Sequence, residues 1–151
     1  MGIIRGTVTQ GGADTFTSDM IDTNLSVDGK SGWQILAMKC FWSNGYSLAA
    51  IDCTVNGLLS TKSTITTMDE SEELTRINYA VQNTGGVAVA FPLEQIKSTV
   101  PLGERITVQP ALYFHVASAG SGQANILSYE IEYEIVKLTE LEIMRLLVGG
   151  A

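Results

Sequence analysis

Three glutamates at alternate positions of one segment form the most chemical-looking pattern in this chain. Glu130, Glu132 and Glu134 alternate with apolar residues between positions 127 and 135. Alternate residues of a β-strand share a face, so neighbouring carboxylates would lie roughly 7 Å apart. This separation fits the paired carboxylates of a glycosidase. Together with loop oxygens, the same row fits a calcium site.

The aromatic residues in this segment argue against a sugar-cleaving site. Tyr129 and Tyr133 occupy the intervening positions and therefore point to the opposite face of the strand. A sugar cleft would need aromatic walls on the carboxylate side. We therefore interpret the glutamates as an acidic contact row, which is either solvated or paired with a basic residue across a subunit contact. Calcium binding stays an alternative.

The sequence offers few other groups for catalysis or metal binding. His115 is the only histidine, and it lies in the apolar segment ALYFHVA, which favours a strand histidine, either satisfied or half-exposed, over a general base. One histidine and two separated cysteines, Cys40 and Cys53, are too few for a zinc site. If 33–42 and 47–55 form a hairpin, the thiols lie roughly 13 Å apart, too far for a disulfide. We predict buried free thiols, no cofactor and no enzymatic activity.

Two glycine-containing segments match chemical motifs only superficially. DGKSG ends like a phosphate-binding loop, but Asn24 stands five residues before Gly29, where that motif requires glycine. AGSGQ, around Ser121, lacks the spacing of a nucleophile elbow and leads into no helix. We interpret the first segment as a turn and the second as a hairpin loop.

Composition narrows the class of protein. The 151 residues suit one domain. The net charge is −7, and the nine basic residues are scattered singly, which argues against direct nucleic-acid binding. Charged residues make up only 17% of the chain, which favours a protein that buries additional surface against copies of itself. The sequence has no apolar run long enough for a transmembrane helix, and we expect no secretion signal.

Eight or nine short segments have strand character and are separated by turn residues. The nearly all-apolar segment 33–42 predicts a strand covered on both faces. Asn44-Gly45 and Asn56-Gly57 predict turns that follow strands. Pro110 lies within a strand pattern, which predicts an edge or a bulge. With few helical patterns, the spacing indicates an all-β antiparallel sandwich or barrel.

The last segment predicts a short helix. Thr139 and Glu142 have the spacing of a capping box, and Gly149 can end the helix. Two helical turns are not stable alone in water, so the helix must dock. It either folds over its own sandwich at 1–138 or also contacts a neighbouring subunit through 139–151. The candidate contact residues are Leu141, Met144, Arg145, Leu147 and Val148.

The strand pattern resembles single jelly-roll viral capsid proteins. GWQILAMKCFW, RITVQPALYFHVASAGSGQANILSYEIEYEIVKL and TELEIMRLL carry the resemblance. The two extended segments around SAGSGQ are similar to the closing hairpin of small coat proteins. The resemblance implies a single jelly roll of about eight strands with a short C-terminal α-helix. It also implies a structural virion protein that is made in the host cytoplasm and self-assembles with copies of itself and with other capsid proteins.

One departure from that family concerns the N-terminus. Many small coat proteins carry a basic N-terminal arm that binds the genome, whereas this chain has only Arg5 before Lys30. The resemblance therefore implies a shell whose genome is held by other proteins or by an internal membrane.

The alternative function is a carbohydrate- or receptor-binding jelly-roll module, such as a decoration or fibre-head protein. Four aromatic residues favour it: Trp33, Trp42, Tyr46 and Tyr113. Trp33 and Trp42, however, bracket an apolar strand, which indicates core positions.

Overall fold

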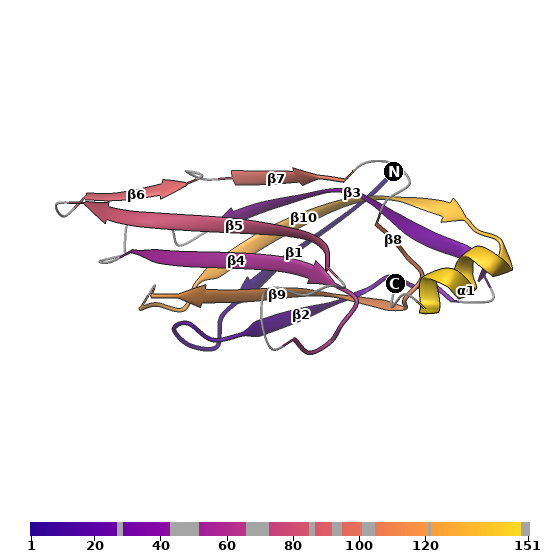
Figure 1. Cartoon of the computed structure of the whole chain (residues 1–151), viewed down its shortest axis with the longest axis horizontal. Coiled ribbons are helices and arrows are strands. Elements are labelled where there is room, and N and C mark those ends of the chain that lie inside the picture. Colours follow the sequence, from indigo (N-terminus) through magenta and orange to yellow (C-terminus); the bar gives the residue numbers. More distant parts are fainter. Residues whose placement is uncertain are drawn as a thin grey trace.

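Two antiparallel sheets face each other, with one helix at the end of the chain (Figure 1). The computed structural model describes residues 1–26, 29–42, 52–65, 73–84, 87–91, 95–100, 105–120 and 122–148. The elements are β1 (Gly2–Thr9), β2 (Thr17–Asp22), β3 (Ser31–Trp42), β4 (Cys53–Ser60), β5 (Glu73–Thr84), β6 (Val87–Phe91), β7 (Gln95–Thr99), β8 (Ile106–Thr107), β9 (Ala111–Ala119), β10 (Ile126–Lys137) and α1 (Glu140–Val148).

The strand order is that of a jelly roll. In the described part of the chain, one sheet has the order β1-β10-β3-β7 and the other β2-β9-β4-β5-β6, while β8 pairs with β3. The chain therefore crosses between sheets at most of its connections. Its last two strands lie between its first ones, with β10 between β1 and β3 and β9 between β2 and β4, which is the double Greek-key arrangement. Eight strands form the jelly roll, and β6 and β8 extend it. The predicted all-β sandwich with a C-terminal helix is confirmed.

Neither the expected hairpin around SAGSGQ nor the hairpin of 33–42 and 47–55, which was considered as a condition, forms. β9 and β10 were expected to pair around SAGSGQ, but β9 pairs with β2 and β4, whereas β10 pairs with β1 and β3. Likewise, β3 and β4 lie in different sheets, so the 33–42 and 47–55 segments do not form a hairpin; Asn44-Gly45 lies outside the described residues. The alternating pattern of a strand predicts which side chains face inward, but not which strand lies beside it.

Asn56-Gly57 was expected to be a turn but lies inside β4. A Cβ atom at Gly57 would approach Phe114 Cζ to 2.7 Å and Ile77 Cγ1 to 3.2 Å. Glycine is therefore required here because neighbouring core side chains pack against the backbone, not because the chain turns.

Pro110 was expected within a strand, at an edge or a bulge, but it lies between two strands. The segment 105–117 divides into β8 and β9, and Pro110 immediately precedes β9. Its carbonyl accepts a 3.0 Å hydrogen bond from the Thr23 N–H.

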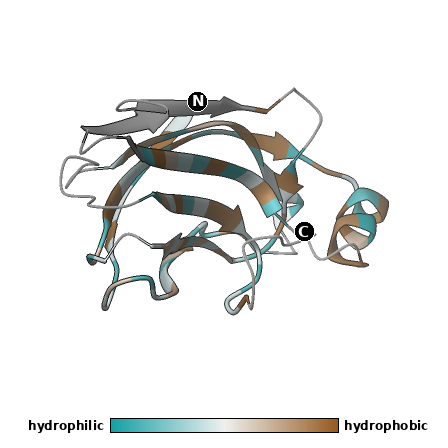
Figure 2. Cartoon of the chain, turned by 60° about the vertical axis from the view of Figure 1, so that its left-hand side comes forward, coloured by the Kyte–Doolittle hydropathy of each residue, from teal (hydrophilic) through white to brown (hydrophobic). Residues whose placement is uncertain are grey.

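The space between the sheets is filled by apolar and aromatic side chains. Trp33 and Trp42 are both buried, as predicted from their positions at the ends of an apolar strand. Trp33 stacks on Tyr133 with 3.7 Å between ring centroids. From the opposite sheet, the Tyr79 hydroxyl donates a 2.8 Å hydrogen bond to the Cys40 carbonyl. Figure 2 shows hydrophobic positions distributed along the strands of both sheets.

β3 is covered on both faces only along its first half. From Gly32 to Met38 all residues except Leu36 are buried, whereas Lys39 is half-buried and Phe41 is exposed. The prediction of a strand buried on both faces therefore holds for the part of β3 that pairs with β8 and lies near the end where α1 sits (Figure 1).

Candidate assembly surfaces

The local sequence builds helix α1 as predicted. The Thr139 hydroxyl accepts a 3.3 Å hydrogen bond from the Glu142 N–H, and the Glu142 carboxylate accepts a 2.7 Å hydrogen bond from the Thr139 N–H. These reciprocal bonds confirm the capping box. The backbone hydrogen bond from Thr139 lowers the pKa of the Glu142 carboxyl, because it favours the charged form. The predicted stop at Gly149 lies outside the described residues.

The segment that leads into α1 is attached to the turn before β3. The Leu138 N–H donates a 2.8 Å hydrogen bond to the Lys30 carbonyl. The Lys30 ammonium also lies 3.1 Å from a carboxylate oxygen of Glu140, although both side chains are largely exposed and the pair contributes little. Gly29 and Lys30 thus form the described part of the predicted turn, Ser31 and Gly32 begin β3, and Asp28 lies outside the described residues.

Only one face of α1 is covered by the sandwich. Ile143 is the buried residue of the helix, at 3% exposure. Leu141, Met144 and Val148, at 59%, 63% and 89% exposure, follow the i, i+3, i+7 spacing and form an exposed apolar stripe. Figure 2 shows the helix beside one end of the sandwich, with both hydrophobic and hydrophilic positions along it.

All five predicted contact residues are exposed. Leu147, at 37% exposure, lies at the margin of the stripe, and Arg145 lies along its other side. The structure thus places the five residues on one short helix and leaves them accessible. Such an apolar stripe on a terminal helix is typical of a contact with another protein surface.

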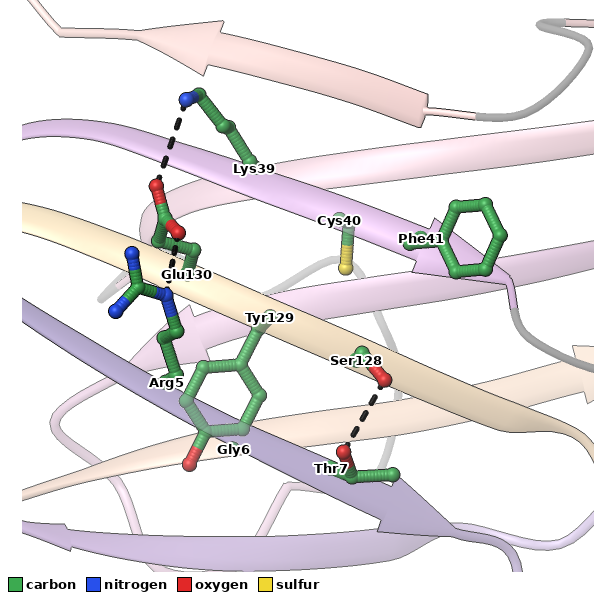
Figure 3. A pocket seen from close by; sticks show the side chains of 9 residues that line it. All are labelled: Arg5, Gly6, Thr7, Lys39, Cys40, Phe41, Ser128, Tyr129 and Glu130. Carbon is green, nitrogen blue, oxygen red and sulfur yellow. Dashed lines mark hydrogen bonds and ion pairs between the residues drawn. The ribbon is translucent and has the colours of Figure 1, made fainter.

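The acidic row meets basic residues within the same chain. Arg5 Nε donates a 2.7 Å hydrogen bond to Glu130, and Lys39 Nζ lies 3.4 Å from Glu130 and 3.7 Å from Glu132. Figure 3 shows Glu130 between Arg5 of β1 and Lys39 of β3. The hydrogen bond from Arg5 lowers the pKa of Glu130, and Lys39 acts in the same direction. Glu134, two residues beyond, is exposed.

The sequence did not reveal Arg5 and Lys39 as the partners of this row. The two cations lie 34 residues apart in the chain and meet only because β1 and β3 flank β10. Arg5 is directly opposite Glu130 in one pairing, and Lys39 is directly opposite it in the other. Only the register of the sheet supplies this information.

A groove of about 470 Å³ lies on the outer face of these three strands. It is lined by Arg5, Gly6, Thr7, Lys39, Cys40, Phe41, Ser128, Tyr129 and Glu130 (Figure 3). Its charges are balanced by the ion pairs just described, and Thr7 and Ser128 share a 3.1 Å hydrogen bond across its floor. The groove therefore presents a surface of paired side chains, with the exposed Phe41 at one side.

The histidine and the two cysteines are buried in the core. His115 is buried; its Nδ1 lies 2.6 Å from the Ser18 hydroxyl and its Nε2 lies 2.8 Å from the Lys62 carbonyl. Both ring nitrogens therefore have partners, so of the two predicted alternatives the satisfied histidine is the one found. Cys40 and Cys53 are free and buried, and burial raises the pKa of the Cys40 thiol to about 12.

The described ranges contain neither a candidate metal cluster nor a helix that could span a membrane. Among the residues that the structure describes, no group of three or more histidine, cysteine, aspartate or glutamate side chains is arranged to hold a metal ion. Within the same ranges, no helix is long and apolar enough to cross a membrane.

The chain matches no protein-family model and no curated protein sequence. Among solved structures, it is similar to a chain of Desmodium yellow mottle tymovirus, with a TM-score of 0.37, 10% identity, and 91% of this chain and 90% of that chain covered. A chain of broad bean stain virus gives a TM-score of 0.35, 7% identity and coverages of 88% and 90%.

A third similar chain comes from infectious bursal disease virus, Gx strain. It gives a TM-score of 0.34 and 12% identity, and the alignment covers 86% of this chain and 30% of that chain. All three are viral structures. The jelly-roll assignment rests on the strand order of this chain itself.

Proposed function

We propose that this chain is a non-enzymatic structural subunit of a viral shell, which assembles with copies of itself and uses α1 as one of its contacts. The observation that carries the proposal is the exposed apolar stripe of Leu141, Met144 and Val148 on a helix with only one covered face. Covering this stripe would remove apolar surface from water, at about 25 cal/mol for each Å².

Two further features support a shell subunit. Jelly rolls are common in viral capsid and lectin domains, so the strand order agrees with the capsid resemblance of the sequence. In addition, Trp33 and Trp42 are buried in the core and are not available to stack on a sugar, which weakens the carbohydrate-binding alternative.

The shell proposal includes the location and partners that the resemblance implies. The subunit would reside in the virion and contact further copies and other capsid proteins. The nine basic residues are scattered singly along the chain, which favours a shell whose genome is held by other components.

Substitution of two equally exposed methionines tests the role of α1. Met144→Asp places a charge on the stripe, while Met20→Asp places one on β2 at nearly the same exposure, 62% against 63%. Light scattering and negative-stain microscopy of the untagged protein would compare the assemblies. We expect Met144→Asp to abolish particles or rings and to leave a folded subunit, and Met20→Asp to assemble normally.

Three outcomes would contradict the proposal. Normal assembly of Met144→Asp shows that α1 is not an interface. A strict monomer of the unmodified protein at high concentration, alone and with candidate partner shell proteins, removes the shell role. Binding to a sugar array by such a monomer assigns the alternative function.

A further inference from the structure

β1 forms an open edge of its sheet. Among the described strands it pairs with β10 alone, and its eight residues run opposite β10 without a register shift, from Gly2–Tyr133 to Thr9–Ile126. Edge strands are usually protected by proline, bulges or unpaired charges, because free backbone groups pair readily with another strand. β1 contains neither proline nor a bulge, and its one charged side chain is paired with Glu130.

The hydrogen bond just beyond β1 shows which backbone groups face the open side. The Gln10 N–H donates a 3.0 Å hydrogen bond to the Asn125 carbonyl, and this pair continues the register of β1 and β10. The backbone N–H and C=O groups of successive residues in an antiparallel strand point to opposite sides of the strand. The backbone groups of the even-numbered residues of β1 therefore point toward β10. The backbone N–H and C=O groups of the odd-numbered residues point toward the open side, and these residues are Ile3, Arg5, Thr7 and Thr9.

We propose that β1 pairs antiparallel with β1 of a second copy of this chain across a two-fold axis. Hydrogen-bonded pairs must then join odd-numbered residues of both copies. Because odd-numbered residues of the two copies lie opposite each other, the outer faces of the two sandwiches lie on the same side of the joined sheet. The two sheets that contain β1 become one continuous sheet, in an isologous contact.

Side chains select one register for this pairing. A register centred on Arg5 places the two Arg5 side chains directly opposite each other, and like charges in that position are destabilising. A register centred on Gly6 places Arg5 opposite Thr7 of the second copy. It also places Ile4, which is partly buried at the margin of the core, opposite the buried Val8 of the second copy. The register centred on Gly6 is therefore the favoured one.

Gly6 suits a position on the axis. The Tyr129 ring extends from β10 across the inner face of β1, and a Cβ atom at Gly6 would lie 2.3 Å from the Tyr129 hydroxyl oxygen (Figure 3). The backbones of the two copies would meet at a point without a β1 side chain. The directly opposite Cα atoms of a non-hydrogen-bonded pair lie only about 4.5 Å apart, so a small residue is favourable there.

The edge is complementary to itself, which is why a second copy is the occupant. An edge strand of the other sheet, β2, carries Asp19 and Asp22 among its six residues and lacks this property. The inference rests on the self-assembly in the proposed function but uses a surface other than α1. A helix of nine residues is only about 14 Å long, so a stable contact of about 800 Å² on each partner requires such additional surface.

Disulfide trapping tests the register directly. In the double variant Ile3→Cys/Thr9→Cys, the two new thiols of one chain lie about 20 Å apart and cannot bridge. Across the proposed axis, each new thiol faces its counterpart at a Cα separation of about 5.5 Å, which a disulfide spans. Mild oxidation should give a covalent dimer of the double variant on a non-reducing gel, and little dimer of either single variant. Equal yields for all three variants overturn the inference.

Charge substitution provides an independent measurement. Thr7→Lys places a cation opposite Arg5 of the second copy, and Thr7→Glu places an anion there. Because the pair occurs twice in the dimer, sedimentation equilibrium should show roughly tenfold weaker dimerisation for Thr7→Lys and stronger dimerisation for Thr7→Glu. Unchanged constants, or shifts in the same direction, overturn the register, and thermal unfolding verifies that both variants fold.

A third variant separates this inference from the proposed function. Met144→Asp, combined with Ile3→Cys/Thr9→Cys, should still give the covalent dimer while larger assemblies are lost. Loss of cross-linking in this combined variant would show that β1 pairing depends on α1 and is not an independent contact.

Discussion

The Tyr129 hydroxyl of β10 donates a 2.7 Å hydrogen bond to a carboxylate oxygen of Asp19 in β2, and this bond joins the two sheets beside their edge strands. The Tyr129 ring also packs against Phe114 of the opposite sheet, with 4.7 Å between ring centroids. One side chain thus covers Gly6 of β1, contacts the core and holds the neighbouring edge strand.

Removing the Tyr129 hydroxyl should destabilise the fold. Tyr129→Phe keeps the ring but leaves Asp19 without its donor, and hydrogen bonds to charged groups contribute about 1.5–3 kcal/mol. Because Asp19 is half-exposed and water can replace the donor, we expect a loss of about 1–2 kcal/mol in the free energy of unfolding, measured with urea. Tyr113→Phe, at a half-buried tyrosine of β9, is the control; an equal loss in both variants would contradict the assignment.

The same tyrosine should make stability fall at alkaline pH. Burial raises the pKa of Tyr129, and the hydrogen bond and charge of Asp19 act in the same direction. Above a pH of about 10 the hydroxyl of a tyrosine in the unfolded chain loses its proton, whereas the Tyr129 hydroxyl of the native chain keeps it. The contribution is complete below that pH and decreases as the pH rises further. Stability measured between pH 9 and 11.5 should decline less steeply in Tyr129→Phe than in the unmodified protein.

Glu130 should make the stability of the fold decrease at acidic pH, whereas Tyr129 makes it decrease at alkaline pH. The hydrogen bond from Arg5 lowers the pKa of Glu130 in the native chain, so its contribution is present above the unfolded value of about 4.3. The contribution is lost as the pH falls through the native pKa. Glu130→Gln should flatten the acid side of the stability profile, whereas Glu134→Gln removes the same charge from an exposed position. Equal flattening by both variants would refute a role for the ion pairs.

Gly57 should not tolerate even a methyl group. In Gly57→Ala the added Cβ would lie 2.7 Å from Phe114 Cζ inside the core, and overpacking of this kind costs about 1–3 kcal/mol. Gly11→Ala is the matched control, because no atom lies within 4 Å of its added Cβ. Thermal unfolding should show a clearly lower Tm for the first variant only. A similar Tm for both would mean that Phe114 moves aside freely.

The capping box should determine how well α1 is held together. Thr139→Ala removes the hydroxyl that accepts from the Glu142 N–H, and loss of such a cap costs about 1 kcal/mol of helix stability. Hydrogen exchange should become faster at Glu142 and in the rest of α1, while the exchange of β10 is unchanged. Thr9→Ala, at an exposed threonine of β1, should leave the exchange of α1 as it is.

The sequence determined the features that depend on neighbouring residues. Alternation of apolar and polar residues predicted the strands, and the spacing of Thr139 and Glu142 predicted the capping box. The apolar surroundings of the two cysteines predicted buried free thiols, and those of His115 predicted a strand histidine. These signals act within a few residues of the chain and therefore do not require knowledge of the fold.

The tertiary structure alone decided which strands are neighbours. β9 and β10 are consecutive but lie in opposite sheets, Gly57 lies in the middle of a strand, and Arg5 and Lys39 meet at Glu130. The exposed side of α1 and the open edge of β1 also follow from this arrangement. The physical reason is that strand pairing is selected by the burial of side chains from distant segments, such as Tyr129 against Phe114, and no local pattern contains that information.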